Sequence, residues 1–157
     1  MKKRTVVVAV AVILVLAAVA GAVYFRSRPM LAPDSAPHVQ SIHAYFGRGE
    51  TSYACDISGE ELPDGVEDAL AALFLGAEMR PRLLPRPQSF QVSDGSVALY
   101  IKVLLEDDDL FVNLGTDPQF CSAQFGDTHY VILDHQTLYQ EAWALLEDTV
   151  TARAHEW

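Results

Sequence analysis

Charge is missing from one long stretch near the start of this chain: residues 5–25 contain no charged side chain. This run of 21 residues consists mostly of Val, Ala, Leu and Ile. A helix of that length rises about 1.5 Å per residue and would be roughly 31 Å long, enough to cross the hydrocarbon core of a bilayer. Three basic residues precede the run and two follow it closely, which favours a cytoplasmic N-terminus. We therefore predict a cytoplasmic stub over residues 1–4 and a single-pass transmembrane signal-anchor helix over residues 5–25, with the lipid bilayer as its partner.

Cysteine is scarce, and none lies near the end of the apolar run. This excludes attachment of lipid at a lipobox cysteine. The alternative to a retained anchor is a secreted domain released by cleavage after Ala20, since Ala18 and Ala20 provide the small-x-small pattern of a signal peptidase site. Cleaved leaders usually have an apolar region of roughly 7–15 residues, and this one is longer. The length favours an uncleaved anchor at the cell membrane with an extracytoplasmic C-terminal domain.

The only two cysteines, Cys55 and Cys121, both follow the apolar run. In an oxidising compartment they are candidates for a disulfide, which would stabilise the domain by about 4–5 kcal/mol in the chain-entropy model. The other interpretation is two separate buried thiols, because free cysteine is among the most buried residue types. The sequence leaves both open, with a slight preference for the bridge.

Positive charge is sparse beyond residue 28. Six Lys and Arg there face all 21 Asp and Glu of the chain, which gives a net charge of −15. Such a field repels polyanions, so nucleic acid is not expected as a partner.

Catalytic motifs are also lacking. The sequence has no Gly-x-Ser-x-Gly elbow, no Ser-x-x-Lys, no glycine-rich phosphate loop and no dinucleotide fingerprint. Cys121, His129 and Asp134 form a thiol triad on paper, but the Thr-Leu-x-Thr-Cys stretch of sortase transpeptidases is absent. We predict no catalytic residues and no cofactor.

Metal-ligand spacings are lacking as well. His129 and His135 are placed on one predicted strand, roughly 20 Å apart at ~3.3 Å per residue, too far to share an ion. The acidic run at residues 106–109 does not have the spacing of a calcium loop and is typical of a solvated hairpin turn. No metal ligands are predicted.

Three prolines and no apolar period mark residues 26–38 as an extended stalk. The remaining residues, 39–157, are predicted to form one extracytoplasmic α+β domain. Alternation of apolar and polar residues predicts strands, while two stretches with helical period predict helices. The strand segments are centred on residues 42–46, 53–57, 90–92, 97–105, 110–114 and 130–133, and the helices are 64–76 and one beginning near Asp134. The predicted order is β-β-α-β-β-β-β-α, an antiparallel sheet with two helices packed on one face. Asp64 and Glu67 have the spacing of a capping box for the first helix.

This arrangement resembles the uncharacterised signal-anchored small extracytoplasmic proteins of Gram-positive bacteria. The basic leader, the anchor, the Pro-rich stalk, the helix Asp64 to Gly76 and the step from Tyr130 to Asp134 carry the resemblance, which implies an architecture and no activity. The expected function is a membrane-anchored binding or interaction module, with an envelope protein as possible partner. A small envelope hydrolase or transpeptidase is the alternative.

Overall fold

An antiparallel sheet is the framework of this protein. The computed structural model describes residues 2–82, 90–106 and 108–157, with the side chains of the first helix from Val8 onward. Over these residues nine strands form one sheet, in the order β1-β4-β8-β7-β6-β5-β2-β3-β9, and every neighbouring pair is antiparallel. The strands are β1 (Arg28–Pro29), β2 (His38–Arg48), β3 (Thr51–Ser58), β4 (Glu78–Pro81), β5 (Val97–Leu104), β6 (Asp109–Gly115), β7 (Ser122–Phe125), β8 (Thr128–Ile132) and β9 (His155–Glu156).

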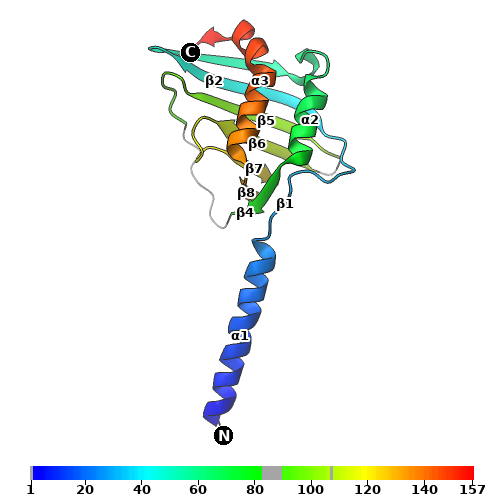
Figure 1. Ribbon diagram of the computed structural model, residues 1–157, viewed down its shortest axis with the longest axis vertical. Coiled ribbons are helices and arrows are strands. Elements are labelled where there is room, and N and C mark those ends of the chain that lie inside the picture. The colour runs from blue at the N-terminus through cyan, green and yellow to red at the C-terminus, as the bar shows by residue number, and fades with distance from the viewer. Residues whose placement is uncertain (1, 83–89, 107) are drawn as a thin grey trace.

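Two helices lie side by side across one face of this sheet (Figure 1). They are α2 (Val66–Gly76) and α3 (His135–Arg153), and a short 3-10 turn, η1 (Gly59–Glu61), leads toward α2. The predicted α+β class with an antiparallel sheet is therefore confirmed. The alternation of apolar and polar residues explains why one face of the sheet is buried. In β2, Ile42, Ala44 and Phe46 are buried whereas the residues between them are not.

The core lies between the helices and the sheet. Leu70 and Phe74 of α2 are fully buried in the same cluster as Leu99 and Ile101 of β5, as the helical period predicts. Val66 and Leu73, which share the helical spacing of Leu70 and Phe74, are only partly buried against this cluster. From α3 the buried side chains are Leu138, Ala142, Leu146 and Val150.

The predicted capping box of α2 is not formed. The helix begins at Val66 because Gly65 adopts a left-handed conformation (φ 81°) at the N-cap, and no side chain caps it. The Glu67 carboxylate instead accepts a hydrogen bond from the Val39 backbone N–H at 2.9 Å and pairs with His38 at 2.6 Å. A tertiary contact thus replaces the predicted local one and connects α2 to β2.

Several short strands lie where the sequence predicts none. The predicted stalk contains β1, and the adjacent Met30 and Leu31 are buried in the core, so this part of residues 26–38 belongs to the packed domain. Strand β4 also lies where the sequence predicts no strand, and residues 83–89 lie outside the described residues. The strand predicted at 90–92 is not formed, whereas β7 and β9 are present where no strand was expected.

The N-terminal helix α1 (Lys2–Tyr24) extends away from the sheet and its two covering helices (Figure 1). Its large apolar side chains are exposed along the described part, from Val8 (61%) to Val23 (70%). In the part of the chain with described side chains, no helix meets the length and apolarity needed to cross a membrane. The transmembrane span stays a prediction.

Candidate binding surface on the open face of the sheet

The face of the sheet opposite α2 and α3, here called the open face, collects polar and aromatic side chains. Strand register sets them in rows across the sheet: His43 of β2 pairs with Tyr100 of β5, which pairs with Asn113 of β6. In the next row Lys102 pairs with Phe111, which pairs with Gln124 of β7. The alternation that buries one set of residues in the core places this set on the open face.

A hollow of about 560 Å³ lies on this face, and we call it the aromatic hollow. Its volume is within the range of small-ligand sites, and its lining is mostly aromatic with one imidazole. Phe111 (40% exposed) and Trp157 (74% exposed) present large apolar surfaces to solvent at its rim. The lining residues are His43, Tyr45, Phe90, Val92, Tyr100, Phe111 and Trp157.

Ring contacts hold the lining together. The Tyr45 ring lies 5.8 Å from that of Tyr100 and 5.5 Å from that of Trp157, measured between centroids, in edge-to-face arrangements. Phe120 extends the cluster, with its ring 5.0 Å from Tyr100 and 5.3 Å from Phe90. Aromatic pairs at such distances contribute about 0.5–1.5 kcal/mol each beyond area burial, so the cluster orders residues from five separate segments.

Trp157 reaches the hollow because β9 pairs with the edge of β3. Glu156 lies opposite Tyr53 and His155 opposite Ala54, and the Trp157 backbone N–H donates to the Ser52 carbonyl at 2.9 Å. This pairing places the indole beside Tyr45.

A smaller, more polar hollow of about 210 Å³ adjoins the aromatic one and shares His43, Tyr100 and Phe111 with it. Lys102 lines this second hollow and forms an ion pair with Asp109 at 2.9 Å. The other polar lining residues are Ser41, Asn113 and Gln124. The open face therefore combines an apolar depression with neighbouring hydrogen-bonding groups, the usual composition of a binding site.

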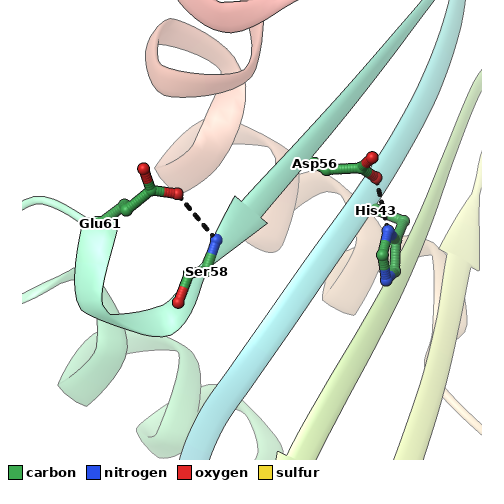
Figure 2. A network of polar contacts seen from close by, with 4 residues as sticks. All are labelled: His43, Asp56, Ser58 and Glu61. Carbon is green, nitrogen blue, oxygen red and sulfur yellow. Dashed lines mark hydrogen bonds and ion pairs between the residues drawn. The ribbon is translucent and has the colours of Figure 1, made fainter.

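The imidazole of His43 is oriented by a carboxylate from the adjacent strand. Its Nδ1 lies 2.5 Å from Oδ1 of Asp56, which sits opposite it on β3, and both side chains are solvent-accessible (Figure 2). A carboxylate can only accept in such a bond, so Nδ1 carries the proton. The same figure shows the Glu61 carboxylate accepting the Ser58 backbone N–H at 3.1 Å. The two contacts hold both ends of the Asp56–Ser58 segment.

Tyr100 stays a neutral hydrogen-bonding group at the floor of the hollow. Burial raises the pKa of its phenol, and the nearby Tyr45 adds to the rise. At neutral pH Tyr100 therefore supplies a ring face and a hydroxyl to the lining rather than phenolate charge.

A second large hollow, about 510 Å³, lies where α2, α3 and the loop after β8 meet. Leu133 (40% exposed) is its most exposed large apolar residue, and three carboxylates surround it. These carboxylates belong to Glu78, Asp134 and Glu141. It lacks the aromatic lining of the open-face hollow.

The structure does not bring Cys55 and Cys121 together. Both are free, buried thiols. Cys55 lies on β3 and Cys121 directly precedes β7, four positions away in the strand order, or roughly 19 Å at about 4.8 Å per strand. A disulfide needs Cα atoms within about 7 Å, so the Cys55–Cys121 bridge is not formed in this fold.

The thiols also lack the surroundings of a nucleophile. Burial raises the pKa of both, with the Asp56 charge as a further cause at Cys55, whereas a reactive cysteine needs a lowered pKa. Cys121 Sγ contacts the Gly115 and Asp117 carbonyls, at 3.5 and 3.7 Å.

His129 and His135 do not share a strand, contrary to the sequence-based placement. His129 lies on β8, whereas His135 is the first residue of α3. In the described part of the chain, no three His, Cys, Asp or Glu side chains converge in a geometry that could hold a metal ion.

Sequence analysis singled out none of the hollow's residues as a site. The available signal was the outward register of the predicted strand, where His43 and Tyr45 alternate with buried Ile42 and Ala44. Nothing in the local pattern indicates that Phe90 and Trp157, far apart in the chain, complete the same depression.

Comparison with known proteins identifies no relative: no family model matches the chain, and no curated sequence or solved structure is significantly similar to it.

Proposed function

We propose that this chain is a membrane-anchored extracytoplasmic binding module whose ligand occupies the aromatic hollow on the open face. The observation that carries the proposal is the gathering of Tyr45, Tyr100 and Trp157, with Phe111 exposed at the rim, on the sheet face that α2 and α3 leave uncovered. Aromatic side chains are costly to leave in water and are enriched at recognition surfaces. A solvent-facing aromatic depression is a reason to expect a ligand.

The membrane anchor is supported by the uncharged run at residues 5–25 and by the exposed apolar side chains of α1. Such a surface on an extended helix requires an apolar environment, which a bilayer would supply. The basic residues before the run favour an N-terminus in the cytoplasm and a domain on the opposite side.

Topology is tested by labelling a cysteine introduced at exposed Ser27 (Ser27→Cys) with a membrane-impermeant maleimide in intact cells. The native thiols are buried, so the unsubstituted chain is the background control. We expect labelling without permeabilisation. Labelling only after permeabilisation would show that the domain has the opposite orientation. Recovery of the chain from the medium with Gly21 as its first residue would show that the leader is cleaved.

Use of the open face is tested by placing a photo-crosslinking amino acid at Phe111 and, as a matched control, at Leu133. Both positions are 40% exposed, but they lie in different hollows. We expect adducts in intact cells from position 111 and not from position 133. Adducts from position 133 alone, or from neither position, would contradict the proposal that the open face is the binding surface.

A hydrolase is the second candidate function, favoured by the His43–Asp56 pair at the hollow. An imidazole oriented by a carboxylate is the base half of a catalytic arrangement. Neither cysteine supplies the nucleophile, because both are buried on other parts of the fold with raised pKa values. Turnover separates the two functions: a hydrolase would have an activity that His43→Gln abolishes, whereas a binding module would have no turnover to lose.

A further inference from the structure

The aromatic hollow has a lining suited to a particular ligand class. The faces of Tyr, Trp and Phe rings carry partial negative charge and attract cations, and groups of such rings recognise quaternary ammonium groups. The hollow supplies Tyr45, Tyr100, Phe111 and Trp157 from three strands and the segment after β9. None of the described lining residues is Lys or Arg, but the Lys102 Nζ of the adjoining hollow lies 5.5 Å from the Phe111 ring centroid. The rings of Tyr45, Tyr100 and Trp157 are therefore the principal faces for a ligand cation.

Charges around the hollow are compatible with a cation. Asp56, 72% exposed at its side chain, lies next to His43 at the edge of the lining. Lys102, in the adjoining hollow, is paired with Asp109 at 2.9 Å, which offsets its charge. His155 lies opposite Ala54 at the outer edge. Beyond these groups, the chain after residue 28 has a net charge of −15, which raises the local concentration of cations.

From this complementarity we infer that the aromatic hollow binds a small organic cation, a quaternary or methylated ammonium compound, from solution. The inference rests on the proposed binding function and names its ligand class. A free solute is favoured over a lipid headgroup by position: β9 and the C-terminal end lie at the opposite end of the domain from α1 (Figure 1). If α1 is in a bilayer, the hollow is held away from that bilayer's surface.

The test uses the full chain labelled with 5-fluorotryptophan, in bilayer discs of phosphatidylglycerol. The protein contains two tryptophans, which serve as probe and internal control. Trp157 lines the hollow, whereas Trp143 packs on the helix-covered side near Phe46, 6.2 Å between ring centroids. Choline and its neutral isostere 3,3-dimethylbutan-1-ol are added in parallel, and a Trp157→Phe variant assigns the two fluorine signals.

We expect choline to shift the Trp157 signal saturably, to leave the Trp143 signal in place, and to bind at least about 5-fold more tightly than the isostere. Equal binding of the isostere, or no shift with choline, would overturn the cation inference without affecting the crosslinking test at position 111. A shift of Trp157 in discs of phosphatidylcholine, before any choline is added, would overturn the free-solute assignment in favour of a lipid headgroup.

A matched pair of variants at Tyr45 tests the ring itself. Tyr45→Phe retains the aromatic face and should bind choline within about 2-fold of the wild type, whereas Tyr45→Leu should weaken binding by about 3- to 10-fold. Asp56→Asn should weaken binding by about 2-fold or more through the lost charge. An unshifted Trp143 signal shows that each variant is folded. Equal affinity of Tyr45→Phe and Tyr45→Leu would contradict the role of the ring.

Discussion

The indole of Trp157 packs against the ring of Tyr45, with centroids 5.5 Å apart and planes at 64°. This contact joins Trp157, which follows β9, to a residue of β2 that lies more than a hundred positions earlier in the chain. It is possible because two residues of β9 pair with the edge of β3. The pairing of the two residues of β9 with β3 thus determines whether Trp157 lines the aromatic hollow.

Truncation of the buried face of α2 should unfold the domain more easily. Phe74→Ala should lower the free energy of unfolding by about 3–5 kcal/mol and Leu70→Ala by about 2–5 kcal/mol, because both side chains are fully buried. Leu75→Ala, at a neighbouring position that is 36% exposed, is the control and should cost about 1 kcal/mol or less. Urea denaturation checks these values, and similar costs for Leu75 and Phe74 would show that the wrong helix face has been assigned to the core.

Substitution by alanine should change the stability of the fold in opposite directions at two glycines, Gly59 and Gly76. A Cβ on Gly59 would collide with the Val39 carbonyl oxygen, which is backbone and cannot move freely, so Gly59→Ala should destabilise by about 1–3 kcal/mol. At Gly76 a Cβ meets nothing within 4 Å, and Gly76→Ala should be neutral or stabilise by up to about 1 kcal/mol. Thermal unfolding of both variants provides the comparison. A stable Gly59→Ala protein would show that β2 and η1 are not in close contact.

The cysteines should titrate as two free thiols. The folded protein is first exposed to an oxidant and then denatured without a reducing agent. It should then react with two equivalents of a thiol reagent, whereas the native protein should react slowly because both thiols are buried. Zero equivalents in a monomer would mean a Cys55–Cys121 bridge and a different strand order.

Thiol burial also predicts a loss of stability at alkaline pH. The pKa of each thiol is raised in the folded state above its ordinary 9.0, so above about pH 9 the unfolded chain releases protons that the folded chain retains. This contribution to stability is fully present below the unfolded pKa and is lost as the pH rises through the folded pKa. Urea denaturation between pH 8 and 10 should show falling stability, with a shallower decline in a Cys55→Ala, Cys121→Ala variant.

Glu61 should titrate below its ordinary value of 4.5. The Ser58 backbone N–H donates to its carboxylate, and Arg153 pairs with it at 3.0 Å; these contacts lower the pKa in that order of importance. A lowered pKa in the folded state stabilises the fold above the unfolded pKa, and this contribution is lost as the pH falls through the folded pKa. An NMR titration of the side-chain carboxyl carbon measures the midpoint directly. Arg153→Gln should move it part of the way back toward 4.5, and an unchanged midpoint would leave the Ser58 bond as the sole cause.

The sequence by itself determined the fold class and the face of α2 that forms the core. Alternation in β2 and β5 and the helical spacing of Leu70 and Phe74 are local patterns, and burial of one face follows from them directly. Tertiary structure decided the remainder. Strands β1, β4 and β9 have two to four residues, too few for a period, and exist because a neighbouring strand offers backbone partners.

The same distinction separates local from long-range contacts at individual residues. Asp64 and Glu67 have the spacing of a capping box, but the left-handed Gly65 shifts the helix start and Glu67 contacts Val39 instead. The separation of Cys55 from Cys121 depends on strand order, and the aromatic hollow depends on rings from distant segments. Neither is encoded in local spacing, because strand order is chosen by the packing of the whole sheet against α2 and α3.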